Sequence, residues 1–284
     1  MLDDGRLVVG FLDETRHLPV TVALTQRAPD GEVVVELAGA ADPTSLGRQV
    51  ARILSLDHDA SGLAAIAAHD PVVARLLAAS PGFRPVCFPS PYEAAVWGVL
   101  GQRISMQVAS GIKQRLAIAT GTIAKGFGRS FHPSPAPERL LALASFPGVA
   151  EEKLARLHAV ALAALDGQLD ATRLRALPHA QAVEELQKLR GVGPWTAEHI
   201  VMRGCGVVDE LPSAEPRVIH GIAHAYGLGD APDRDEVLRI AEAWAPYRMW
   251  IAVLLVMNLH GTPGWKRNRR PSVVRSRRAL PLHG

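Results

Sequence analysis

The stretch Leu189–Ile200, LRGVGPWTAEHI, places two glycines one residue apart directly before a proline. Gly191 and Gly193 permit a positive φ and a close approach of the backbone, and Pro194 suits the first turn of a helix. We therefore expect one helix to end near Leu189, a tight turn to follow, and a second helix to begin at Pro194.

Such a turn exposes the free amide groups at the N-terminus of its second helix. Together with the positive end of the helix dipole, these amides form a site for an anion such as a phosphate, without the help of a basic side chain. A plain connection between two helices has a similar sequence. The turn alone therefore leaves both interpretations open.

Helical periodicity covers most of the chain, but the first segment differs. In residues 7–39, three β-branched runs separated by turn residues predict short strands: LVVGFL, LPVTVALT and EVVVELAG. Residues 80–91, rich in proline, glycine and serine, mark a domain boundary. The fold class is therefore α+β, with a small mixed α/β domain over residues 1–84, an all-α domain over residues 85–265 and a basic tail over residues 266–284.

Capping signals and periodicity predict the helices of the second domain. Ser90, Pro91 and Glu93 form a capping box at the start of the first. No strand is expected beyond the N-terminal segment. The expected helices cover residues 91–100, 104–116, 137–145, 150–166, 180–189, 194–203, 216–226, 233–244 and 247–259.

Composition excludes several classes of protein. Hydrophobic residues make up 48% and charged residues 21%, close to the averages for a folded soluble protein. The longest apolar run, Met249–Met257, is too short to span a bilayer, and no apolar signal region follows the acidic start, so we expect a cytoplasmic protein. Cys87 and Cys205 are too few for a metal cluster held by thiolates, and we expect them to be buried.

The positive charge is concentrated near the C-terminus. Residues 266–278 hold seven Lys or Arg and no acid in a chain of net charge +3, so the remainder is slightly acidic. A basic tail can bind phosphates with salt-sensitive affinity, or it can serve only as a solubilising end. The sequence leaves both roles open.

The hairpin and its surroundings resemble the helix-hairpin-helix DNA glycosylases, specifically the bacterial 3-methyladenine DNA glycosylase II type. The family pattern L-x-G-(I/V)-G-P-W-T-A stands at Leu189–Ala197, followed in order by Arg203, Gly206, Asp209 and Pro212. Further stretches match in chain order: SPYEAAVWGVLGQRIS, FPGVAEEKLARLHAVA, LRALPHAQAVEEL and AEAWAPYRMWIAVLL. The resemblance covers nearly the whole chain to about residue 259.

The resemblance implies a monofunctional hydrolase that excises alkylated purines of the 3-methyladenine type during base excision repair. Such enzymes act on double-stranded DNA and flip the damaged nucleotide out of the duplex, and we expect this one to act as a monomer. An alkylated purine already carries a positive charge, so the main task is to stabilise the oxocarbenium-like sugar with a carboxylate. The family places an Asp three residues after the proline matched by Pro212, and Glu215 stands there.

The predicted site departs from the family at three positions. Glu215 keeps the charge but adds one methylene, and a displacement of about 1 Å can cost roughly a hundredfold in rate. Trp195 keeps an aromatic of the base pocket, but His199 stands where a Tyr is expected and Val256 where a Trp is expected. Fewer aromatic faces hold a cationic base less well, so the resemblance implies a narrower or different substrate range.

Other positions of the family pattern carry further expectations. Members that also cut the strand have a Lys after the GP pair, which forms a Schiff base, and Trp195 stands there, so no lyase activity is expected. No cofactor is required, although main-chain carbonyls of the hairpin hold a monovalent cation in the family. The matching carbonyls are those of Gln187, Leu189 and Val192, and the expected DNA-binding residues are Gly191, Val192, Gly193, Thr196, Gln102 and Arg103.

Alternatives remain open at this stage. Glu215 also suits the start of a helix, where an acid complements the dipole without any catalytic role. A non-catalytic DNA-binding or damage-sensing protein would keep the hairpin and the basic tail while losing the Asp and half of the aromatic pocket. A glycosylase for a bulkier or neutral base would use the small Val256 and hydrogen bonds from His199.

Overall fold

The computed structural model describes residues 5–28, 31–229 and 232–259. The predicted basic tail, residues 266–284, lies outside the described residues. The described part is mostly helical with a small antiparallel sheet, so the predicted α+β class is confirmed in its coarse form. None of the described helices is both long and apolar enough to cross a membrane.

The N-terminal segment forms the three predicted strands. β1 (Leu7–Leu12), β2 (Pro19–Gln26) and β3 (Val33–Ala38) pair antiparallel in the order β1-β2-β3. Helix α1 (Pro43–Ile53) begins at Asp42, whose carboxylate accepts a hydrogen bond from Ser45 N at 2.7 Å. The helix packs on the sheet through a shared apolar cluster, which contains Phe11, Val20, Val22, Leu46 and Val50.

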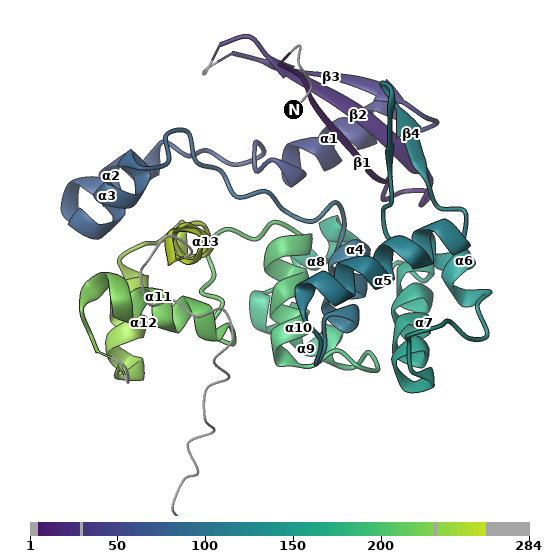
Figure 1. Cartoon of the computed structure of the whole chain (residues 1–284). Coiled ribbons are helices and arrows are strands. Elements are labelled where there is room, and N and C mark those ends of the chain that lie inside the picture. The colour runs from purple at the N-terminus through teal and green to yellow at the C-terminus, as the bar shows by residue number, and fades with distance from the viewer. Residues whose placement is uncertain (1–4, 29–30, 230–231, 260–284) are drawn as a thin grey trace, which may run out of the picture.

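A second, unpredicted hairpin extends this layer. β4 (Ala124–Gly126) and β5 (Arg129–Phe131) come from the middle of the chain and lie beside β1 and β2 (Figure 1). Two glycines make the approach possible: a Cβ on Gly10 would lie 2.6 Å from the Phe131 ring, and one on Gly126 would lie 2.7 Å from Ala38. The two strands are too short to produce a periodic signal, which explains why the sequence did not predict them.

One group of helices lies beneath the sheet (Figure 1). Helix α4 is its centre, because nearly every residue of that helix is buried, and it packs against α7, α10 and η1. Most bounds agree with the prediction within a few residues, but α8 was not predicted, and the helix predicted over residues 194–203 is divided into α10 and the π-helical turn η1. The elements are α4 (Pro91–Leu100), α5 (Met106–Ala119), α6 (Pro137–Leu141), α7 (Glu151–Leu165), α8 (Ala171–Ala176), α9 (His179–Gln187), α10 (Pro194–His199) and η1 (Ile200–Gly204).

A second group of helices combines two segments that lie far apart in the chain. It contains α2 (Gly62–His69), α3 (Pro71–Ala78), α11 (Pro216–Tyr226), α12 (Arg234–Glu242) and α13 (Arg248–Leu259). These helices lie close together (Figure 1). Their apolar faces share a core built around the fully buried Trp244 and Trp250. The division at residue 84 stays a prediction, and α2 and α3, which precede it, pack with the C-terminal helices rather than with the sheet.

Glu93 does not complete the predicted capping box. Ser90 Oγ accepts a hydrogen bond from Glu93 N at 3.1 Å, as the motif requires. The Glu93 carboxylate, which is only 4% exposed, points away from Ser90. It accepts hydrogen bonds from Leu12 N at 3.2 Å and from Ser134 N at 3.0 Å. This buried acid therefore links the end of β1 to the helical group and does not make the second hydrogen bond of a capping box.

The predicted hairpin between α9 and α10 is confirmed, and its two glycines differ. Gly191 has φ +85°, and a Cβ there would lie 2.5 Å from the Arg156 side chain. Gly193 has φ −91° and ψ −179°, an extended conformation, and a Cβ there would meet nothing within 4 Å. Gly191 therefore makes the turn possible, whereas Gly193 leaves an open, exposed surface before Pro194.

This difference predicts unequal effects of alanine in the hairpin. Gly191→Ala should lower the free energy of unfolding by about 1–3 kcal/mol, because it strains the backbone and displaces Arg156. Gly193→Ala is the matched control and should change it by less than about 0.5 kcal/mol. Urea unfolding followed by circular dichroism measures both, and equal values for the two variants would contradict this assignment.

Candidate active site

Glu215 lies at the N-terminus of α11, at the end of the loop that leaves η1. It is the N-cap residue: its Oε1 accepts a hydrogen bond from Arg217 N at 3.1 Å, and Pro216 takes the first helical position. The loop before it is anchored by Glu198, whose carboxylate accepts from Ala214 N at 3.1 Å. The structure therefore confirms that Glu215 starts a helix, one of the roles considered from the sequence. The cap hydrogen bond from Arg217 N orients the carboxylate.

The Glu215 carboxylate is surrounded by donors. The Arg217 guanidinium binds it in a two-bond arrangement, with Nε to Oε1 at 2.8 Å and Nη2 to Oε2 at 2.9 Å. Trp195 Nε1 donates to Oε2 at 3.0 Å. The side chain of Glu215 is 16% exposed and that of Arg217 is 42% exposed. Each carboxylate oxygen thus accepts two hydrogen bonds.

These contacts keep Glu215 ionised. Burial on its own would raise the pKa of the carboxyl group, but the hydrogen bonds and positive charge of Arg217 outweigh it, and Trp195 adds to them. The net pKa lies below its ordinary value of 4.5. The group is therefore a carboxylate across the neutral range, as stabilisation of a sugar cation requires.

Trp195 also connects Glu215 to an aromatic stack. The rings of Trp195 and His199 are stacked, with centroids 5.0 Å apart and planes 9° apart, because four residues separate them on one helix face. Phe88 meets His199 edge-on at 5.0 Å. The structure therefore brings together three of the predicted site residues: Trp195, His199 and Glu215.

His199 is neutral in this setting. Burial lowers its pKa from 6.5 to about 4, with a further contribution from the charge of Arg203. Its Nε2 is buried without a hydrogen-bond partner. A neutral imidazole between Trp195 and Phe88 behaves as one more flat ring of the stack.

Val256 was predicted for the base pocket together with Trp195 and His199. It lies on α13, where it packs partly buried against the core of the second helical group. Trp195 and His199 lie in the other group, on α10. A place for Val256 in the base pocket therefore stays a prediction.

The loop between α4 and α5 is fixed to the hairpin. Gln102 Nε2 donates to Gly191 O at 2.8 Å, and Arg156 Nη1 donates to Gln102 Oε1 at 2.9 Å. Lys153 Nζ donates to the Gln102 carbonyl at 2.9 Å. Arg103 follows with an exposed side chain and a positive φ of 62°, which is uncommon for a residue other than glycine. Gln102 thus links the two segments, and Arg103 stands at the exposed tip.

The remaining hairpin residues divide between surface and core. Gly193 is exposed, whereas Val192 and Thr196 are 5% and 4% exposed. The Thr196 methyl group lies against Gly98 of α4, so this side chain holds α10 in place rather than presenting a surface contact. Of the carbonyls predicted to hold a cation, that of Leu189 accepts from Val192 N at 3.0 Å. A cation site there stays a prediction.

Several residues of this site were missed by the sequence analysis. Arg217, Arg156 and Lys153 all contact predicted site residues through side-chain hydrogen bonds. A spacing of two residues between an acid at a helix start and an arginine could have suggested the Arg217 pair. The contacts of Arg156 and Lys153 join residues about 50 positions apart, for which the sequence carries no local signal.

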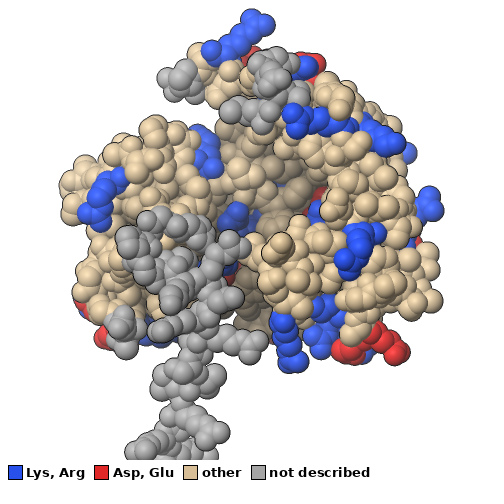
Figure 2. All heavy atoms as spheres, viewed as in Figure 1, with Lys and Arg blue, Asp and Glu red and all other residues tan. Residues whose placement is uncertain are grey.

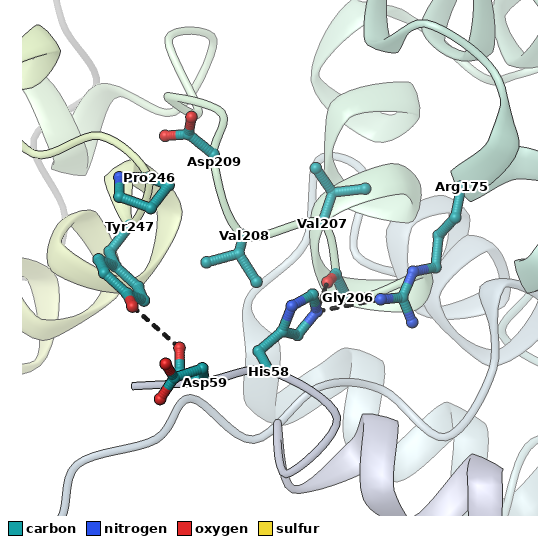
Figure 3. Close-up of a pocket in the computed structure, with 9 residues that line it drawn as sticks. All are labelled: His58, Asp59, Arg175, Gly206, Val207, Val208, Asp209, Pro246 and Tyr247. Atoms are coloured by element: carbon teal, nitrogen blue, oxygen red, sulfur yellow. Dashed lines mark hydrogen bonds between the residues drawn. The ribbon is translucent and has the colours of Figure 1, made fainter. Parts of the chain in front are cut away.

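A recess elsewhere in the molecule is separate from this site. Figure 3 shows residues from four parts of the chain around it, among them His58, Arg175, Asp209 and Tyr247. His58 Nε2 lies 3.1 Å from Gly206 O and 3.0 Å from Arg175 Nη2. Neither the predicted carboxylate nor the aromatic stack lines this recess.

The surface between the two helical groups is hollowed. Figure 2 shows this hollow with Lys and Arg side chains in and around it. Cys87 and Cys205 are buried, as predicted, and both are free thiols. Burial raises the pKa of Cys205 to about 12. Among the described residues, no cluster of His, Cys, Asp and Glu is suited to a metal ion.

The chain is similar in sequence and structure to known DNA glycosylases. No family model matches the chain. It is 27% identical over 204 residues to the DNA-3-methyladenine glycosylase of Bacillus subtilis, a match that covers 70% of this chain and 67% of the relative. It is 31% identical over 210 residues to a protein of Mycobacterium tuberculosis named probable bifunctional transcriptional activator/DNA repair enzyme AlkA, covering 70% of this chain and 40% of the relative. The structure of a 3-methyladenine DNA-glycosylase from Archaeoglobus fulgidus superposes with a TM-score of 0.73 at 20% identity, covering 88% of this chain and 86% of that one, which shows a shared fold.

The neutral state of His199 predicts a pH dependence of stability. The pKa is lower in the folded state than in the unfolded chain, so the stability that this group contributes is lost as the pH falls from about 6.5 towards 4. His199→Phe keeps a ring in the stack and removes the titration. Between about pH 7 and pH 5, the wild type should therefore lose about 1–2 kcal/mol more than the variant in urea unfolding. Identical losses would show that His199 does not titrate in this way.

Proposed function

Because the chain belongs to the helix-hairpin-helix DNA glycosylase superfamily, of the 3-methyladenine DNA glycosylase II type, we propose that it excises alkylated purines from double-stranded DNA. The reaction is hydrolysis of the N-glycosidic bond after the damaged nucleotide leaves the duplex. The single observation that carries the proposal is the hydrogen bond between Trp195 and Glu215. It joins an aromatic face for a base to a carboxylate for its sugar.

The two residues divide the chemistry between them. A purine alkylated on a ring nitrogen is a cation, which the face of an aromatic ring attracts, so Trp195 holds the base by stacking. The bond to the sugar then breaks as positive charge develops on the sugar ring, and the Glu215 carboxylate stabilises that charge. Since the base leaves as a neutral molecule, no general acid has to protonate it first.

The hairpin and the neighbouring loop bind the DNA backbone in this proposal. Gly193 leaves an open surface at the start of α10, where the phosphate can approach the main chain. Arg103 enters the gap that the extruded nucleotide leaves. The carbonyls of Gln187, Leu189 and Val192 would hold a monovalent cation, whose positive charge would attract the DNA backbone.

Strand cleavage is not part of the proposed activity. A lyase needs an amine that attacks the sugar and forms a Schiff base. Trp195 occupies the position where lyase members of the superfamily have a Lys. Lys153, which contacts the loop between α4 and α5, donates to two main-chain carbonyls, those of Leu100 and Gln102, each at 2.9 Å. The proposed enzyme is therefore monofunctional.

One observation favours the second candidate, a protein that binds damaged DNA without excising the base. All four hydrogen bonds to the Glu215 carboxylate come from Arg217 and Trp195, and the Arg217 charge neutralises it. A carboxylate in that state stabilises a sugar cation poorly. The two candidates differ in whether free base is released.

Release of free base from methylated duplex DNA tests the proposal. The wild type should release alkylpurine, and Glu215→Gln should reduce the rate by roughly a hundredfold or more while changing duplex affinity little, because only the charge is lost. Glu185→Gln is a suitable control, since Glu185 also pairs with an arginine, Arg173, but lies on α9. Its rate should equal that of the wild type.

A Glu215→Asp variant separates the candidates. Equal release by wild type and Glu215→Gln would remove Glu215 from the mechanism. No release by the wild type, together with release by Glu215→Asp, would show that the scaffold binds DNA and lacks only a carboxylate of the right length.

A further inference from the structure

We propose that Arg217 acts as a phosphate-binding residue: it leaves Glu215 for a phosphate of the extruded nucleotide, and this exchange frees the carboxylate to face the sugar. The inference rests on the proposed glycosylase function. In this proposal, Arg217 neutralises Glu215 before DNA binds and contributes to DNA affinity afterwards.

Glu215 is held mainly by Arg217 in this structure. Its two oxygens accept four hydrogen bonds, three of them from Arg217. The guanidinium lies within 2.9 Å of both oxygens, so its positive charge cancels most of the field that the carboxylate exerts on a group further away. A cationic base and a developing sugar cation would also be repelled by Arg217. The arrangement without DNA is therefore not the reacting one.

The Arg217 side chain can leave without disturbing Glu215. Its side chain is 42% exposed, and partly exposed ion pairs contribute little net stability. Two of the four hydrogen bonds to Glu215 do not involve the guanidinium: the one from Trp195 Nε1 and the cap bond from Arg217 N. These two bonds keep the carboxylate in place after the exchange.

A phosphate beside the extruded sugar is the group that binds the guanidinium in place of Glu215. The sugar of a nucleotide within a strand is linked to a phosphate on each side. If Glu215 contacts that sugar, Arg217, which touches Glu215, lies near one of the two phosphates. A guanidinium binds phosphate through two parallel hydrogen bonds, as it binds a carboxylate, so the exchange preserves its geometry.

The chain contains a matched pair for comparison. Arg248 binds Asp209 with the same two-bond geometry, Nε to Oδ1 at 2.8 Å and Nη2 to Oδ2 at 3.0 Å. This pair fixes the loop that leads from η1 towards α11, and Asp209 lines the separate recess. Neither partner of this pair contacts Glu215 or Trp195. Arg248 should therefore not exchange its carboxylate for a phosphate.

The salt dependence of DNA affinity tests the exchange. The probe is a duplex with a tetrahydrofuran abasic analogue, which keeps the sugar and both phosphates and cannot be cleaved. Each phosphate contact contributes about 0.9 to the slope of log affinity against log salt concentration. Arg217→Gln should lower the slope by about 0.9, whereas Arg217→Lys and Arg248→Gln should leave it unchanged. An unchanged slope for Arg217→Gln, in a variant that unfolds like the wild type, would overturn the proposal.

Single-turnover release of alkylpurine distinguishes phosphate binding by Arg217 from a role in which Arg217 only positions Glu215. With Arg217 on the phosphate, Glu215 is free in wild type and variant alike. In Arg217→Gln, the DNA concentration for half-maximal release should therefore rise by a larger factor than the rate at saturating DNA falls. If Arg217 instead positioned Glu215 during the reaction, the variant would lose the rate and keep the salt slope, and the proposal would fail. Absence of release by the wild type would refute the glycosylase function, while the salt slope would still report on Arg217.

Discussion

A half-buried carboxylate at the N-terminus of α11 must stay ionised, and the surroundings of Glu215 satisfy that constraint. Burial raises the free energy of the charged form, and the donors of Arg217 and Trp195 lower it by more. Trp195 can donate only because α10 starts at the hairpin and packs on α4 through Thr196 and Gly98. The hairpin, α4 and the start of α11 therefore converge on one charged group, which links the packing of the helices to the chemistry of the site.

Much of this arrangement follows from local signals. The glycines and proline of the hairpin, the three β-branched runs and the prolines at helix starts predicted elements whose bounds the structure confirms within a few residues. The stacking of Trp195 on His199 also follows from their spacing, because residues four apart share a helix face. The helix-start role of Glu215 was an alternative drawn from the same kind of signal, whereas its catalytic role came from the resemblance and stays a prediction.

The features that escaped prediction depend on contacts between distant parts of the chain. Glu93 has the spacing of a capping box, but its carboxylate instead accepts hydrogen bonds from two main-chain amides of other segments. The α2–α3 pair precedes the apparent boundary, yet its apolar residues join the core of the C-terminal helices. The Gln102–Gly191 contact is one choice among many donors and acceptors of similar strength, which tertiary packing decides.

The most direct test of Glu215 as the charge that faces the sugar is a comparison of two abasic mimics in the same duplex. One carries a cationic pyrrolidine ring, which imitates the charge of the reacting sugar, and the other a neutral tetrahydrofuran ring. The wild type should bind the cationic mimic more than about tenfold tighter, and Glu215→Gln should bind both equally. Equal binding of the two mimics by the wild type would contradict the role assigned to Glu215.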